Sequence, residues 1–196
     1  MTALQDQLIA RFGRLTRRFV LRPEEAGDRA FLFDLYCRCQ AENHARYGLD
    51  ILATLGLPML EMQFDNQYRG FRAAYPAASF LLPVTADGGE PVGRMIADWP
   101  GDGTAHGVDV AVLPDRREGA PGLLMLRTWM AVADRNGLVC SLRVLPDNPA
   151  RLIYRRLGFV EADLNEMPLR MVRQVPVGWT PGPTHSIRSG FPHRDQ

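Results

Sequence analysis

The stretch Val-Asp-Val-Ala-Val-Leu-Pro (residues 108–114) runs through Arg-Glu-Gly-Ala-Pro-Gly (117–122) into the apolar run Leu-Leu-Met-Leu (123–126). The alternation in its first part predicts a β-strand over 108–113, and the glycines and proline predict a tight turn. The third part opens an amphipathic helix whose apolar residues recur every three or four positions: Leu123, Leu126, Met130 and Ala133. We expect that helix to end near Asn136 and Gly137.

The turn has the composition of a phosphate-binding site. A strand that passes directly into a helix points several backbone N–H groups at one place, and the first helical turn adds partial positive charge. A pyrophosphate can bind to such a nest without a lysine. Gly119 and Gly122 permit close approach of a phosphate, and Pro121 is tolerated in a first helical turn although it lacks an N–H.

A second motif follows at Asn-Pro-Ala-Arg-Leu-Ile-Tyr (148–154) and Arg-Arg-Leu-Gly-Phe (155–159). It predicts a short helix that presents Tyr154 and ends at Gly158. A phenol has an ordinary pKa of about 10 and can donate a proton to a leaving group. The alternative is that Tyr154 is a half-buried core residue of an amphipathic helix.

Together the two motifs resemble the acetyl-CoA core of the Gcn5-related N-acetyltransferase (GNAT) superfamily, over roughly residues 18–173. The match counts from Arg117, three residues after Pro114, and has Ala120 where glycine is usual. The resemblance implies an α/β fold with a mixed central sheet of about six to seven strands flanked by helices. It also implies acetyl-CoA as the cofactor and direct transfer of an acetyl group to a primary amine, either a small molecule or a peptide.

The resemblance further implies roles for individual residues. Cofactor binding falls to the strand end, the turn and the second motif, namely Ala111, Val112, Leu113, Arg117, Glu118, Gly119, Ala120, Pro121, Gly122, Leu123, Asn148 and Tyr154. Asp147 is the alternative to Asn148, because many relatives place the asparagine seven residues before the tyrosine. A strand amide within 111–113 would polarise the thioester carbonyl.

Tyr154 would protonate the leaving thiolate, and a general base would accept the proton of the amine. Asp109 is the nearest carboxylate on the motif-bearing strand, and we interpret it either as that base or as a structural residue, in an ion pair or facing solvent. Arg143 stands on the next strand, where some relatives carry a glutamate.

The rest of the chain supplies further elements. Alternating or continuous apolar runs predict strands at residues 19–23, 79–84, 91–98, 138–144 and 167–172. Helices are expected after Asp28, which can act as a cap, and from about Pro58. Residues 99–107 are interpreted as a loop, with His106 an incidental loop residue.

Composition limits the function. The net charge of +1 argues against nucleic acid as a main partner. The three cysteines have no framework spacing, which favours a reducing cytoplasm over disulfides. The four histidines are scattered, so we expect no metal site. No apolar run has the length of a membrane-spanning helix, so we expect no membrane partner.

Two extensions flank the predicted domain at 18–173. Residues 1–17 contain an apolar stripe at helical spacing, made of Leu4, Leu8, Ile9, Phe12 and Leu15. With its arginines the segment loosely resembles a transit peptide, but we favour a docking or dimerisation helix. Residues 174–196 are rich in proline and glycine and are expected to form a tail. A homodimer could form through either extension.

Two other functional classes stay open. The first is an acyl-CoA-binding regulatory protein that has the fold without turnover, which Ala120 and the missing glutamate would suit. The second is an interaction module that uses the N-terminal helix and the tail. Tyr154 argues against the first class, and the pair of motifs argues against the second as a sole role.

Overall fold

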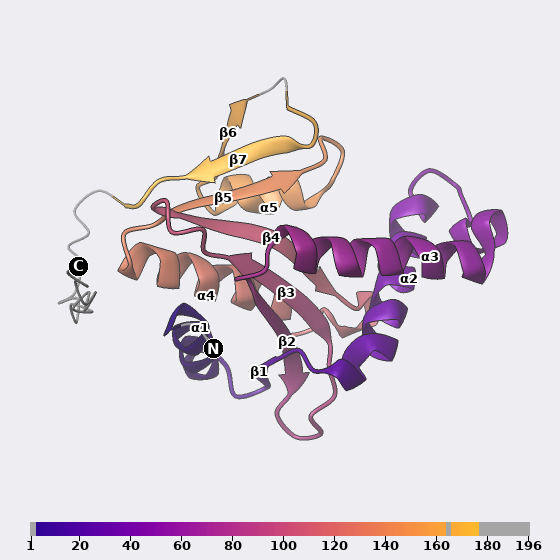
Figure 1. Cartoon of the computed structure of the whole chain (residues 1–196), viewed down its shortest axis with the longest axis horizontal. Helices are drawn as coiled ribbons and strands as arrows, with labels where there is room; N and C mark the ends of the chain where they lie inside the picture. The colour runs from indigo at the N-terminus through magenta and orange to yellow at the C-terminus, as the bar shows by residue number, and fades with distance from the viewer. Residues whose placement is uncertain (1–2, 164–165, 177–196) are drawn as a thin grey trace, which may run out of the picture.

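A mixed seven-stranded sheet organises the computed structural model, which describes residues 3–163 and 166–176 (Figure 1). The strand order is β1-β2-β3-β4-β5-β7-β6. The strands are β1 (Phe19–Pro23), β2 (Ser79–Thr85), β3 (Gly93–Asp98), β4 (Thr104–Val112), β5 (Val139–Val144), β6 (Val160–Asp163) and β7 (Leu169–Arg173). Neighbouring strands are antiparallel except β4 and β5, which are parallel. The predicted fold class is therefore confirmed.

Helices cover both faces of the sheet (Figure 1). They are α1 (Ala3–Leu15), α2 (Arg29–Ala45), α3 (Ile51–Ala74), α4 (Pro121–Arg135) and α5 (Ala150–Arg156). Leu81 and Leu82 are successive residues of β2 and so point to opposite faces; Leu81 packs in the cluster of α1 and α4, and Leu82 in that of α2 and α3. Among the described residues, no helix has both the length and the apolarity needed to cross a membrane.

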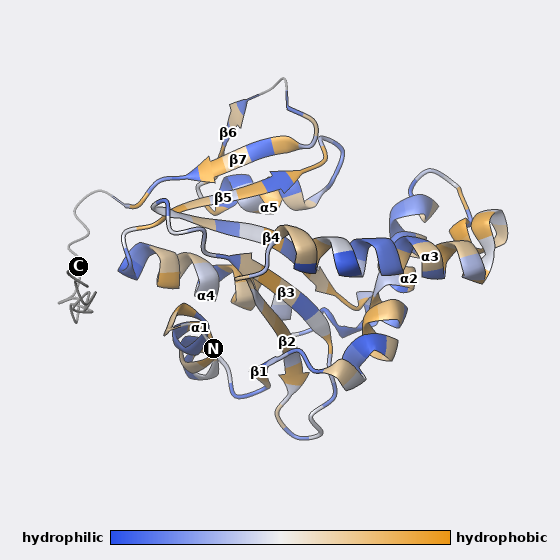
Figure 2. Ribbon diagram, in the orientation of Figure 1, coloured by the Kyte–Doolittle hydropathy of each residue, from blue (hydrophilic) through white to orange (hydrophobic). Residues whose placement is uncertain are grey.

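The N-terminal helix is part of the main core. Leu8 and Phe12 have no exposed surface and pack in the same cluster as Trp129 of α4. The centre of the apolar stripe that suggested a docking helix is thus buried against its own chain, while Leu15 at its end is exposed. Figure 2 shows apolar residues at the outer end of α3. Leu52 and Leu57, in the first turns of this element, are 50% and 57% exposed. The tail from residue 177 onward, including its predicted role in a dimer, lies outside the described residues.

The α3 element consists of two helical segments separated by a kink at Gly56, which has a φ of 72° and a ψ of 162°. The second segment starts next to Pro58, as predicted. The first segment, from Ile51, was not predicted; it starts where the Asp50 carboxylate accepts hydrogen bonds from the N–H groups of Leu52 and Ala53, both at 3.0 Å.

Asp28 does not cap α2 with its side chain, although it occupies the N-cap position. Its carboxylate accepts hydrogen bonds from both terminal nitrogens of Arg22, at 2.7 and 2.6 Å, and from the Glu25 N–H at 2.8 Å. The expectation that Asp28 caps α2 was therefore wrong, because Arg22 of β1 donates to both oxygens of its carboxylate.

The predicted loop at 99–107 was also partly wrong, because β4 begins at Thr104. His106 and Gly107 lie within the strand, and the register between β3 and β4 shifts at Ile96 and Ala97. Gly107 faces Trp129 so closely that an added Cβ would lie 3.1 Å from the indole ring. The glycine is needed for this packing, yet it interrupts the apolar alternation that would have marked the strand. The short strand β6 was likewise not predicted.

Candidate functional site

The sheet opens at its centre, where β4 and β5 separate. Residues 104–107 pair with residues 139–142, although β4 runs on to Val112 and β5 to Val144. Beyond that point β4 stays paired with β3 and β5 with β7. The edges of the two central strands that face each other therefore lack a strand partner.

The backbone of Val112 faces this opening. The Leu113 N–H donates to the Val92 carbonyl at 2.9 Å, so Leu113 points its backbone groups away from β5. Successive strand residues alternate, and the N–H and C=O of Val112 therefore point toward β5. The Val112 carbonyl accepts a hydrogen bond from the Cys39 thiol at 3.7 Å. Of the three residues 111–113 that sequence analysis considered, Val112 is the one with its amide in the opening.

The predicted phosphate-binding turn lies at the end of β4. Gly119 and Ala120 both have positive φ, 78° and 52°, and α4 begins immediately afterwards at Pro121. Gly122 packs on Val112, since an added Cβ would lie 3.3 Å from Val112 Cγ2. The first-turn N–H groups of Gly122 and Leu123 have no acceptor within the helix. The turn therefore presents free donors beside the strand opening.

Arginines around this turn are neutralised by carboxylates. Arg117 donates to both oxygens of Glu42, at 2.7 and 2.5 Å. Arg116 pairs with Glu90 at 3.1 Å. Two arginines from outside the turn complete the set, as Arg38 pairs with Asp115 at 2.7 Å and Arg18 with Glu118 at 3.6 Å. The turn thus offers backbone donors and a helix dipole, with little surplus positive charge.

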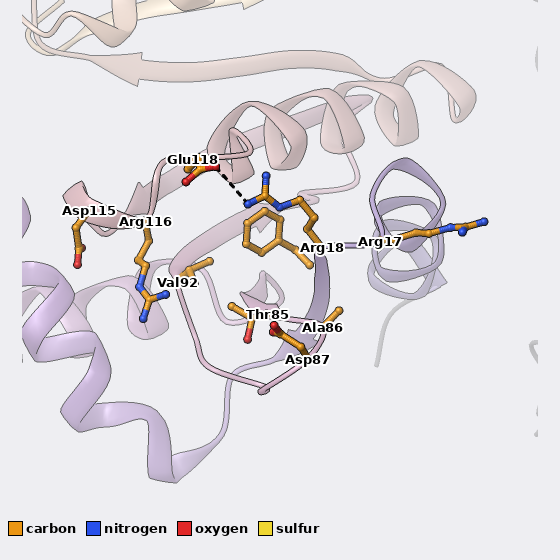
Figure 3. Close-up of a pocket in the computed structure, with 10 residues that line it drawn as sticks. Arg17, Arg18, Thr85, Ala86, Asp87, Val92, Asp115, Arg116 and Glu118 are labelled. Carbon is orange, nitrogen blue, oxygen red and sulfur yellow. Dashed lines mark ion pairs between the residues drawn. The ribbon is translucent and has the colours of Figure 1, made fainter.

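A cavity of about 450 Å³ lies on the other side of the same turn (Figure 3). Its walls come from the junction of α1 and β1, the β2–β3 turn and the β4–α4 turn. Arg18, Thr85 and Glu118 are among its lining residues, and none of them belongs to β5 or α5. The cavity is therefore distinct from the opening between β4 and β5.

Asp109 is ion-paired. Arg94 of β3 donates to its Oδ2 through Nε at 2.8 Å and lies within 2.7 Å of it through Nη2. The Arg94 side chain is only 7% exposed, and its guanidinium lies 5.4 Å from the centre of the Phe71 ring. Of the two interpretations of Asp109, the ion pair is present in the structure, and Arg94 is a site residue that sequence analysis missed.

Tyr154 lies on α5 near the same carboxylate. Its ring packs edge-on against Phe159, with centroids 6.0 Å apart. Burial, and next the negative charge of Asp109, raise the pKa of Tyr154 to about 12. Its hydroxyl has no hydrogen-bond partner among the described residues. The phenol is therefore held protonated and available as a donor.

Asn148 and Asp147 are both engaged in local contacts. The Asn148 side-chain oxygen accepts the Ala150 N–H at 2.9 Å at the start of α5. Asp147 accepts a hydrogen bond from the hydroxyl of Tyr47, which lies in the turn between α2 and α3. The side chain of Asn148 keeps its amide NH₂ for a further contact.

Cys39 and His106 are two further partly buried polar residues. Burial raises the pKa of the Cys39 thiol to about 11, and the nearby charge of Asp109 adds to that rise. His106 shares a hydrogen bond with the Ser141 hydroxyl at 3.0 Å, and burial lowers its pKa. Cys39 lies beside the opening through its contact with Val112, whereas His106 lies on the paired part of β4, outside the opening.

The fold has relatives among solved structures, although the sequence matches no protein-family model and no curated protein. PaiA N-acetyltransferase from Thermoplasma acidophilum, in complex with coenzyme A, is similar with a TM-score of 0.60 and 15% identity, over 80% of this chain and 98% of that one. A GNAT-family acetyltransferase from Staphylococcus aureus Mu50 follows at 0.58 and 11%, over 81% and 99%. The ribosomal-protein-S18-alanine N-acetyltransferase from Escherichia coli gives 0.54 and 16%, over 80% and 94%. The chain therefore has the fold of the GNAT acetyltransferases, as its two motifs predicted.

The left-handed conformation of Ala120 generates a stability prediction. Ala120→Gly removes the steric cost of a Cβ at positive φ and should raise the free energy of unfolding by about 1 kcal/mol. Gly119→Ala is the matched control and should lower it, because φ is again positive and the new Cβ would lie 3.2 Å from Arg18 Nη1. Urea denaturation measures both. A destabilised Ala120→Gly variant would show that residue 120 is not left-handed in solution.

Proposed function

We propose that this protein is an acetyl-CoA-dependent N-acetyltransferase that moves an acetyl group to a primary amine by direct attack on the thioester. One observation carries the proposal: the opening between β4 and β5 ends beside the free N-terminus of α4. The similar fold of the T. acidophilum N-acetyltransferase, which was solved in complex with coenzyme A, supports coenzyme A as the kind of cofactor.

The residues around the opening suit the parts of coenzyme A. The N–H groups of Gly122 and Leu123 suit the diphosphate, because a helix N-terminus favours an anion. The inward-facing backbone of Val112 suits an amide of the pantetheine arm or the thioester carbonyl. When bound, acetyl-CoA would supply the activated acyl group. A hydrogen bond from a strand N–H to the carbonyl oxygen would stabilise negative charge as it develops there.

Two side chains would handle protons. Tyr154 would protonate the departing thiolate, since its raised pKa keeps the phenol neutral. Asp109 would receive the proton of the amine through water, because Arg94 occupies its Oδ2 atom and leaves Oδ1. A base that acts through water is more dispensable than one in direct contact, so Asp109 is proposed to assist turnover without being essential.

A second candidate function is an acyl-CoA-binding protein without turnover. The Arg94–Asp109 ion pair favours it, because Arg94 already occupies one oxygen of the only proposed base. Assays with acetyl-CoA and a panel of amines and peptides separate the two functions. Binding of acetyl-CoA without product from any acceptor would favour the binding protein.

Acetyl-CoA should raise the melting temperature of the protein, because a ligand that binds only the native state stabilises it. Gly122→Glu should abolish that rise by placing a carboxylate among the free N–H groups. Gly13→Glu on α1 is the matched control, since an added Cβ there meets no atom within 4 Å. The placement of the diphosphate is wrong if the folded Gly122→Glu variant still gives the full shift.

Tyr154→Phe should lower kcat by about 10²- to 10⁴-fold, the usual value of general acid catalysis. The Kd for coenzyme A should hardly change, because the ring still packs on Phe159. Because the pKa of Tyr154 is raised to about 12, its phenol should stay protonated up to about pH 10. Deprotonation of Tyr154 should therefore not lower the wild-type kcat below that pH.

Steady-state kinetics with any amine that turns over measure this effect. Tyr36→Phe is the control, because that hydroxyl donates to Gln63 at 3.2 Å and serves no proposed step. An unchanged kcat in Tyr154→Phe would return Tyr154 to the role of a packing residue.

A further inference from the structure

One turn of α2 is attached to the end of β4 and to the turn that follows it. Arg38 pairs with Asp115 at 2.7 Å, and the Cys39 thiol donates to the Val112 carbonyl at 3.7 Å. One helical turn after Arg38, Glu42 accepts two hydrogen bonds from Arg117. In the first ion pair α2 supplies the cation, Arg38, and in the second it supplies the anion, Glu42. The helix therefore binds one acidic and one basic residue of the same turn.

The Arg117–Glu42 pair is strong but reachable from solvent. Both oxygens of the carboxylate are engaged, which raises the pKa of Arg117 and lowers that of Glu42. The two side chains are 51% and 33% exposed, so a ligand can approach the guanidinium without unfolding the helix. The pair also lies near the opening, because both of its charges act on the thiol of Cys39.

A guanidinium binds a carboxylate and a phosphate through the same planar fork of donors. Arg117 belongs to the turn that is proposed to hold a diphosphate, yet its donors are occupied by Glu42. An incoming diphosphate therefore meets an internal competitor of the same chemistry. An acetyl donor without a phosphate group has no anion that could bind Arg117, so it leaves the Arg117–Glu42 pair intact.

We propose that Glu42 is an internal competitor for the diphosphate of the cofactor: Arg117 bonds Glu42 in the free protein and transfers to the diphosphate of a coenzyme A thioester. This inference rests on the proposed function. Because a coenzyme A thioester must displace Glu42 from Arg117, the pair weakens the binding of donors that carry a diphosphate and leaves the binding of plain pantetheine thioesters unchanged. The exchange also detaches the C-terminal end of α2, near Tyr47, while the Arg38–Asp115 pair still holds the middle of the helix.

Binding measurements with two ligands test the exchange. Coenzyme A carries the diphosphate and S-acetylpantetheine does not, and thermal-shift titrations into the millimolar range give both affinities. Glu42→Gln should tighten coenzyme A roughly threefold, the scale of a partly exposed ion pair. Arg117→Gln should weaken coenzyme A roughly tenfold, because Glu42 then faces the diphosphate unpaired. Neither change should alter the affinity for S-acetylpantetheine.

Asp115→Asn is the matched control, because it also removes one negative charge from an α2–turn ion pair but frees Arg38 instead of Arg117. It should leave the coenzyme A affinity within about twofold of wild type. In the double variant Glu42→Gln/Arg117→Gln, the gain from Glu42→Gln should disappear, since there is no guanidinium left to release.

Three outcomes would overturn the proposal. Equal tightening by Asp115→Asn and Glu42→Gln would mean that only the overall charge matters. An unchanged coenzyme A affinity in Glu42→Gln would mean that Arg117 does not exchange. Tightening of S-acetylpantetheine by Glu42→Gln would mean that the diphosphate is not the group recognised. Failure of the folded wild-type protein to bind coenzyme A would instead overturn the proposed function itself.

Discussion

The short parallel contact between β4 and β5 is the feature on which the rest of the site depends. Four residue pairs join the strands, and then each strand continues with its outer neighbour. Gly107 lies at the last pair, where an added Cβ would lie only 3.1 Å from the Trp129 ring. The separation beyond it frees the backbone of Val112, and the same strand end delivers the chain to the N-terminus of α4. The opening between β4 and β5 and the positive end of the α4 helix dipole therefore lie next to each other.

Charge in this site is arranged in pairs. Arg94 holds Asp109 inside the sheet face, while Glu42 holds Arg117 at the rim. Paired charges lose less free energy on burial than isolated ones, which lets the protein keep polar groups beside an apolar core. Each ion pair also limits the proposed function. Asp109 must accept a proton while it is bound to Arg94, and Arg117 must leave Glu42 to bind the diphosphate. Backbone donors and the phenol of Tyr154 are the groups that stay uncommitted.

Local features of this fold could be predicted from sequence, and contacts between distant segments could not. The turn at 117–122 and the helix at 150–156 were recognisable because glycine, proline and apolar spacing act over a few residues. The start of β4 was missed, since Gly107 serves its packing against Trp129 and breaks the pattern. The partners of Asp109 and Arg117 were out of reach for a different reason. Arg94 and Glu42 lie on other elements, and no local pattern specifies such pairs.

An amide ¹H–¹⁵N NMR titration with coenzyme A tests directly whether the cofactor binds between β4 and β5 at the start of α4. The largest shifts are expected at the N–H groups of Val112, Gly122 and Leu123, because these donors face the opening and the helix start. Amides around the cavity of Figure 3, such as Thr85 and Ala86, should move little. Shifts confined to that cavity, with Val112 and Gly122 unchanged, would show that coenzyme A does not bind at the opening.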